Sequence, residues 1–120
     1  MKGVVDEFGR ALLPLQVKAV ANALPQELAV WVDTAFDGDL VLPVTAIGKL
    51  GLTQSALVRA TLADGSSTVL ETFACLVEWF DKTLEIQAIA NQGLFPLLGI
   101  GLLRGHELVV DYRAGIVAVN

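Results

Sequence analysis

Short apolar runs of strand length recur along the whole chain, and turn-forming residues separate them at close intervals. The first clear run spans residues 13–20, where Leu15 and Val17 fall on one face and Gln16 and Lys18 on the other. A period of two is typical of a strand that buries one face. Many such runs at close spacing favour a β barrel or sandwich over alternating βαβ units. The sequence therefore predicts an all-β fold.

One segment departs from this pattern and predicts a short helix. Strands are expected over residues 28–33 and 40–42, and Pro43 follows the second of them. Proline suits the first position of a helix because its φ is already helical. A helix is therefore expected over Val44–Leu50, with Gly51 as its terminator.

Turn signals predict three hairpins. Asp-Gly between extended arms is a strong hairpin signal, because both central residues of the favoured turn need positive φ. The longest hairpin joins residues 57–62 to residues 68–77 through Ala63, Asp64, Gly65, Ser66 and Ser67. The other two are expected to turn at Asp81-Lys82 and at residues 113–115.

The size and composition of the chain indicate one domain with a subunit interface. A length of 120 residues fits a single domain, taken as 1–120. The chain is 54% hydrophobic and only 18% charged, which is more apolar material than so small a globule easily buries. Part of it is expected to lie in a subunit interface.

Charge and hydropathy exclude two classes of partner. The net charge is −5 and the eight Lys and Arg residues are scattered, whereas nucleic-acid binding needs clustered cations. The longest apolar stretch, residues 93–103, contains Pro96 and is shorter than the roughly 20 residues that cross a bilayer. Asp6 and Glu7 precede any apolar run that could act as a secretion signal. We expect no nucleic acid, no membrane and a cytoplasmic location.

The single cysteine and the single histidine give no sign of chemistry. Cys75 has no partner for an internal disulfide, and its apolar surroundings predict a small core residue. His106 follows Gly105 in an expected turn, and no serine or cysteine nucleophile motif lies nearby. We interpret it as a surface residue.

Asp33 is the most informative residue, because it ends an apolar strand and directly precedes Thr34. A lone carboxylate there is costly unless it is hydrogen-bonded or paired. One interpretation is a turn cap, in which Asp33 accepts backbone N–H groups from Ala35 or Phe36.

A second interpretation of this segment is a calcium loop. Asp33, Asp37 and Asp39, together with Gly38, supply hard oxygen ligands over seven residues. The segment lacks the alternating ligands and the late bidentate Glu of an EF-hand. The local sequence leaves both interpretations open.

A third interpretation comes from an ordered series of motifs along the chain. These are Val32-Asp33-Thr34-Ala35-Phe36-Asp37-Gly38, Leu40-Val41-Leu42-Pro43, Leu50-Gly51-Leu52, Ala63-Asp64-Gly65-Ser66 and Leu97-Leu98-Gly99. The series resembles the retropepsin-like aspartic proteases, particularly small microbial members that read Asp-Thr-Gly-Phe and later Leu-Leu-Gly. It covers the chain from about Val17 to Val119. Its specificity lies in order and spacing, since Asp-Thr-small alone is weak.

The resemblance implies a closed acid-protease-like β barrel with one or two short helices, forming one half of a two-fold homodimer. The chain would be an aspartic endopeptidase that needs no metal and no cofactor. Its catalytic residues would be Asp33, Thr34 and Ala35. The chain has one Asp-Thr-small motif, so the second aspartate would come from the other subunit. The two carboxyl groups would share one proton and activate a water, while Thr34 would hydrogen-bond across the axis.

The same resemblance implies where a peptide or protein substrate binds. The 63–67 hairpin would be a flap that closes over an extended peptide held by strand-like pairing. Leu97-Leu98-Gly99 would pass behind the active-site loop, where Gly99 permits close backbone approach. The implied substrate-binding residues are Phe36, Asp37, Ala63, Asp64, Gly65, Ser66, Leu98 and Gly99.

Ala35 is the one clear departure from the family pattern, which has Gly after Asp-Thr. Its Cβ stands where two loops approach, and it fits only if φ is negative. The hairpin also has Gly65 as its only glycine. These two features motivate an alternative, a catalytically weak or inactive dimer of protease fold that binds peptide or protein.

Overall fold

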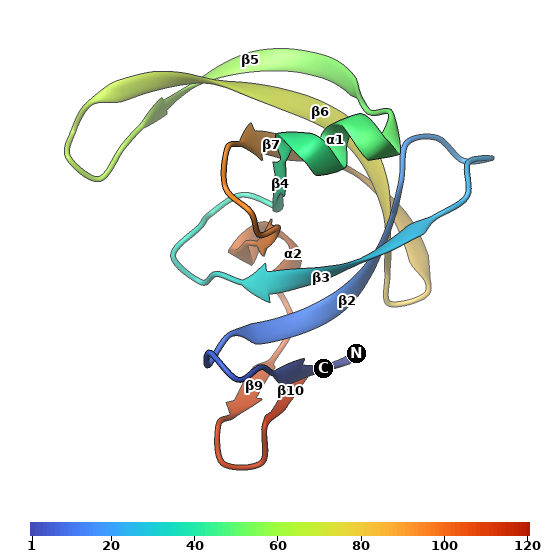
Figure 1. Cartoon of the computed structure of the whole chain (residues 1–120), viewed down its shortest axis with the longest axis vertical. Helices are drawn as coiled ribbons and strands as arrows, with labels where there is room; N and C mark the ends of the chain where they lie inside the picture. Colours follow the sequence, from blue (N-terminus) through green and yellow to red (C-terminus); the bar gives the residue numbers. More distant parts are fainter.

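A computed structural model describes residues 1–120, and strands make up most of it (Figure 1). The elements in chain order are β1 (Lys2–Val5), β2 (Ala11–Lys18), β3 (Gln26–Val32), β4 (Leu40–Pro43), α1 (Val44–Leu50), β5 (Thr53–Thr61), β6 (Ser67–Trp79), β7 (Lys82–Asn91), β8 (Leu97–Leu98), α2 (Ile100–Leu103), β9 (Leu108–Asp111) and β10 (Ile116–Val119).

The strands form one sheet that closes on itself. The sheet order is β5-β6-β7-β4-β8-β3-β2-β1-β10-β9, and β6 also pairs with β2 through Val17 and Val77. This extra pairing closes a barrel of six strands, from β6 round to β2. The closed β barrel with one or two short helices that the resemblance implies is confirmed, and the structure has two such helices. Closure leaves β5 as an overhang beyond β6, and β1, β10 and β9 as an extension beyond β2.

The barrel interior is filled by alternate residues of the strands. In β2, Leu13, Leu15 and Val17 are at most 1% exposed while Pro14 between them is exposed. This is the period of two that the sequence predicts. The termini lie together beside the barrel (Figure 1), where the Met1 amino group donates to the Val119 carbonyl at 2.9 Å.

The local predictions hold for α1 and shift elsewhere by a few residues. Helix α1 ends at Gly51, which has φ +69° and donates its N–H to the Ile47 carbonyl. Pro43 ends β4 and caps the helix instead of starting it. Strand β3 begins at Gln26, two residues before its predicted start, because its first residues pair with β2. Helix α2 is the second of the one or two helices that the resemblance implies, and no residue pattern in the sequence locates it.

The β6–β7 hairpin turns at Phe80-Asp81, one residue earlier than predicted. Both residues have positive φ, +50° and +64°, and Trp79 pairs with Lys82. Side-chain packing accompanies this unfavourable backbone, since the Phe80 ring stacks on His106 with 4.4 Å between ring centroids. Tight hairpin turns usually have Gly or Asn at the residues with positive φ, and neither is present here. Contacts with a distant segment therefore fix the position of this turn.

His106 is therefore not the simple surface residue that its sequence context predicts. It is half-buried, and Trp79 donates Nε1–H to His106 Nε2 at 3.3 Å. His106 Nδ1 lies 3.2 Å from the Asn120 carbonyl oxygen, so a neutral ring protonated at Nδ1 satisfies both contacts. The turn at Gly105, with φ +80°, brings the ring back against the end of the β6–β7 hairpin.

Cys75 lies in the core as predicted, and it is 1% exposed. Burial, reinforced by the charge of Asp39, raises the pKa of its thiol from 9.0 to about 11. The native thiol is therefore expected to react with a disulfide reagent at mildly alkaline pH at least about a hundredfold more slowly than the unfolded chain. Absorbance of the released chromophore with and without denaturant measures this ratio. Equal rates in the two conditions would contradict the packing described for β6.

Candidate active site

Asp33 follows the last residue of β3 and leaves the barrel core at that point. Val32 is 9% exposed and faces the core, while Asp33 is half-exposed at the end of the strand. Strand β8 runs parallel to β3, with Val32 opposite Leu98, and the Asp33 N–H donates to the Leu98 carbonyl at 2.9 Å. The backbone of Asp33 is thus fixed by a strand that is itself fully inside the sheet.

The carboxylate of Asp33 is oriented by its own loop. The Ala35 N–H donates to Asp33 Oδ1 at 3.0 Å, and the Phe36 N–H donates to the Asp33 carbonyl at 3.2 Å. This is the hydrogen bond that the turn-cap interpretation predicts. It leaves Oδ2 without a partner in the chain. Capping and catalysis are compatible, because one oxygen holds the carboxylate in place while the other is free to act.

Ala35 fits this loop without backbone strain. Phe80 and Asp81 are the only non-glycine residues with positive φ, so Ala35 has the negative φ that an alanine requires. Both Thr34 and Ala35 are exposed. The side chain of Ala35 therefore lies at the surface of this chain.

The segment after β8 packs directly behind the loop. Three consecutive N–H groups donate at 2.9 Å to loop carbonyls: Gly99 to Asp39, Ile100 to Phe36 and Gly101 to Gly38. A Cβ at Gly99 would collide with the Gly38 carbonyl and with Phe36. Glycine is required there because two backbones meet with no room for a side chain. The structure thus brings Leu98 and Gly99 together with the Asp33 loop.

The 63–66 turn lies at the tip of the long β5–β6 hairpin, away from contact with the Asp33 loop. In Figure 1 the hairpin extends beyond the barrel on the side where that loop lies. Gly65 has φ +85°, and Ser66 hydrogen-bonds to Asp64 through its hydroxyl and its N–H, which lowers the pKa of Asp64. The ribbon exposes apolar residues, with Leu57 63% and Val69 57% exposed. A two-stranded ribbon with such exposure calls for a covering partner or ligand.

Three solved structures share this architecture. A retropepsin-like aspartic protease from Rickettsia conorii aligns with a TM-score of 0.66 and 19% identity, covering 100% of this chain and 89% of that one. EIAV protease in complex with the inhibitor HBY-793 aligns with a TM-score of 0.54 and 19% identity, covering 82% of this chain and 89% of that one. The chain has the retropepsin fold. The retroviral protease-like domain of Ddi1 from Leishmania major aligns with a TM-score of 0.51 and 12% identity, covering 91% of this chain and 86% of that one.

The three structural alignments show the fold of the chain. No protein-family model matches the sequence, and no curated protein matches it. No helix of the structure is long and apolar enough to span a membrane.

Within the retropepsin fold of this chain, the three aspartates of the calcium interpretation do not converge. Asp37 is exposed and Asp39 is half-buried. No three potential His, Cys, Asp or Glu ligands come together anywhere in the structure.

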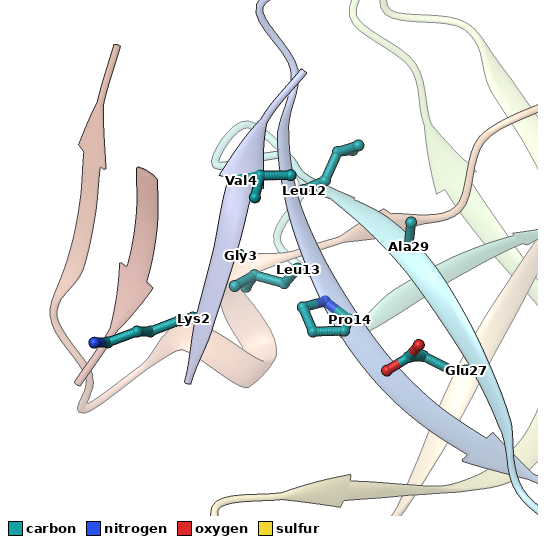
Figure 2. Close-up of a pocket in the computed structure, with 8 residues that line it drawn as sticks. All are labelled: Lys2, Gly3, Val4, Leu12, Leu13, Pro14, Glu27 and Ala29. Atoms are coloured by element: carbon teal, nitrogen blue, oxygen red, sulfur yellow. The ribbon is translucent and has the colours of Figure 1, made fainter. Parts of the chain in front are cut away.

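A cavity of about 480 Å³ lies apart from Asp33, on the outside of the retropepsin barrel (Figure 2). Figure 2 shows that β1, β2 and β3 line it, with Lys2 and Glu27 as its charged residues. It forms where β1 diverges from β2 after the pairing of Val4 with Leu12. None of the predicted site residues lines it.

Sequence reasoning missed a group of polar residues beside the loop. Ser55, Thr72 and Gln87 lie together with Asp39 around one cavity. The sequence presents Asp39 only as one possible ligand of a calcium loop. The other three come from three separate strands, and only the register of those strands brings them together. A hydroxyl or amide at an otherwise apolar strand position was the only available signal.

Proposed function

We propose that two copies of this chain form an aspartic endopeptidase, with one Asp33 carboxylate contributed by each subunit. The observation that carries the proposal is the Asp33 loop of the retropepsin fold. Its carboxylate is oriented by the Ala35 N–H and has one free oxygen. The chain contains only one such motif. A two-fold axis brings equivalent residues together, so a second copy completes the pair.

The chemistry follows from two carboxyl groups in close proximity. Both cannot ionise there, so the pair holds one proton. The ionised Asp33 takes a proton from a water, and the water oxygen attacks the peptide carbonyl carbon. The protonated Asp33 donates to the carbonyl oxygen, and the resulting tetrahedral intermediate collapses with proton transfer to the leaving amine. No covalent bond to the enzyme forms.

The proposed substrate is an extended peptide held under the 63–66 hairpin. Phe36 and Asp37 of the loop would lie on one side of the peptide, and Ala63, Asp64, Gly65 and Ser66 on the other. Leu98 is fully buried and Gly99 lies behind the loop, so these two residues would position the loop without touching the peptide. Thr34 is exposed and is available to hydrogen-bond across the dimer axis.

Subunit mixing tests the shared site. The wild-type chain is expected to cleave a mixed peptide library between acid and neutral pH, with inhibition by a statine-type peptide. Wild type and Asp33→Asn chains are then unfolded, mixed equally and refolded together. If each site needs two Asp33 residues, the activity of the mixture is about a quarter of that of wild type at the same total chain concentration. Only that fraction of dimers pairs two wild-type chains. A fall to about half indicates independent sites, and no cleavage by wild type at any pH refutes the proposal.

The alternative is a dimer that keeps the fold and binds peptide without cleaving it. The observation that favours it is Ala35, whose exposed Cβ would face its equivalent across the axis. Two methyl groups there could hold the loops apart.

Ala35→Gly distinguishes the two functions. Because the Ala35 backbone is unstrained, the peptidase proposal predicts a kcat/KM within about tenfold of wild type, or ~1.4 kcal/mol. A much larger gain would show that Cβ contacts block catalysis in the natural chain. The melting temperature provides the matched readout, since glycine here should cost about 0.5–1 kcal/mol through backbone entropy.

The cytoplasm is the compartment that we propose for this dimer. Cys75 is the only cysteine and lies buried as a free thiol, so the fold does not depend on oxidising conditions.

A further inference from the structure

A second cavity, of about 460 Å³, opens between the Asp33 loop and the base of the β5–β6 hairpin. Gly38 and Asp39, the last loop residues before β4, form one wall. Residues of β5, β6 and β7 form the other walls. The loop and the hairpin are the two parts that the proposed function assigns to peptide binding. The cavity is therefore placed to receive a side chain of a bound peptide.

A β-bulge builds the polar wall of this cavity. The β5–β6 register shifts between Gln54 and Ala56, which leaves Ser55 without a cross-strand partner. Bulges redirect side chains and are common beside functional sites. Ser55 Oγ contacts Gln87 Oε1 and lies 3.1 Å from Thr72 Oγ1, and Thr72 in turn donates to the Ala56 carbonyl at 3.3 Å. This network joins three strands and carries no charge.

Asp39 is the only ionisable residue that lines the cavity. Its side chain makes no hydrogen bond and no ion pair within the chain, and desolvation alone raises its pKa. A Cβ at Gly101 would collide with Asp39 Oδ1, so a glycine in α2 makes room for this carboxylate. A half-buried carboxylate without a partner is costly. The carboxylate oxygens reach solvent, so Asp39 is an acceptor that water or a cationic group of a ligand can occupy.

We propose that this cavity is a specificity pocket for a lysine or arginine side chain of the substrate, with Asp39 binding its charged head. The inference rests on the proposed peptidase function and adds a substrate class to it. Val58 and Ile89 line the cavity and would pack against the methylene stem of the basic side chain. A hydrogen bond between a cation and a carboxylate is about twice as strong as a neutral one. Ser55, Thr72 and Gln87 add no positive charge that would oppose the ligand.

Matched peptides test the pocket. A positional peptide library first identifies the substrate position with a basic preference, and two peptides then carry lysine or norleucine there. Wild type is expected to favour lysine by about 10- to 100-fold in kcat/KM. Asp39→Asn should abolish this preference, mostly by raising KM for the lysine peptide. Glu85→Gln removes the same charge from an exposed residue of β7 and should leave the preference intact.

Two further measurements separate this inference from the peptidase proposal. Asp39 has a folded pKa above its usual 3.8, so its ionised form opposes folding as pH rises. Asp39→Asn should therefore melt no lower than wild type at neutral pH.

Binding of both peptides is also measured in an Asp33→Asn background. Cleavage without a basic preference overturns the pocket alone. Lysine-selective binding that Asp39→Asn removes, without any cleavage by wild type, supports the pocket and overturns the peptidase. Absence of both overturns both.

Discussion

Asp33→Asn is expected to lower kcat/KM for peptide cleavage by about 10²- to 10⁴-fold, the usual contribution of general acid and base catalysis. Each dimer would lose both carboxyl groups, and an amide neither accepts the water proton nor donates to the carbonyl oxygen with comparable strength. The fold should survive the substitution. The asparagine oxygen can still accept the Ala35 N–H that Asp33 Oδ1 accepts at 3.0 Å. Initial rates on a fluorogenic peptide from the library, across acid to neutral pH, measure the effect.

Asp111→Asn is the matched control for this substitution. Asp111 also ends a strand and caps its own turn, since its Oδ1 accepts the N–H groups of Arg113 and Ala114 at 3.0 and 2.9 Å. Loss of charge at a capping aspartate should therefore shift the melting temperature similarly in both variants. Only Asp33→Asn should lose activity. Equal cleavage by wild type and Asp33→Asn would leave Asp33 a turn cap and nothing more.

The features of the fold that follow from local rules were predictable. The alternation of Leu15 and Val17 with Gln16 and Lys18 identifies β2, and Gly51 marks the end of α1. The closed barrel is implied by the resemblance, which rests on the order of motifs along the whole chain. The signals for β2 and α1 are short-range patterns of side-chain polarity and backbone freedom.

The features that depend on register were not predictable. The resemblance places residues 97–99 behind the loop, but the pairing of Leu98 with Val32 in the two-residue strand β8, and its acceptance of the Asp33 N–H, depend on the register. The bulge at Ser55 is defined by the register of β5 against β6, which the residues of β5 alone do not determine. The Phe80-Asp81 turn is held by packing on His106, which lies far along the chain. Contacts between distant segments decide all three.

The candidate site also has residues that a local motif identifies and residues that only the strand register brings together. Asp33 and its neighbours are contiguous in the sequence, so one motif identifies them. Asp39 lies in the same segment, but it lines a cavity whose other walls come from strands β5, β6 and β7. Residues that confer specificity in such a site come from several strands, and sequence patterns within one strand do not reveal them.

Gly99→Ala is expected to destabilise the chain by about 1–3 kcal/mol, the usual cost of forcing an extra methyl group into a packed region. The new Cβ would collide with the Gly38 carbonyl, which is backbone and cannot rotate away. Relief requires that the 33–39 loop moves off the segment after β8. The hydrogen bonds from Gly99 to Asp39 and from Gly101 to Gly38 would then lengthen or break. Thermal or denaturant unfolding measures the stability change.

Gly48→Ala adds the same methyl group elsewhere and should have the opposite sign. Gly48 lies inside α1, where a Cβ meets nothing within 4 Å, so alanine should stabilise the helix by up to about 1 kcal/mol. Activity separates positioning from stability. Because the segment behind the loop supports the backbone that carries Asp33, Gly99→Ala should lower kcat even well below its melting temperature, and Gly48→Ala should not. A Gly99→Ala chain with wild-type kcat would show that Asp33 keeps its orientation from the Ala35 N–H alone.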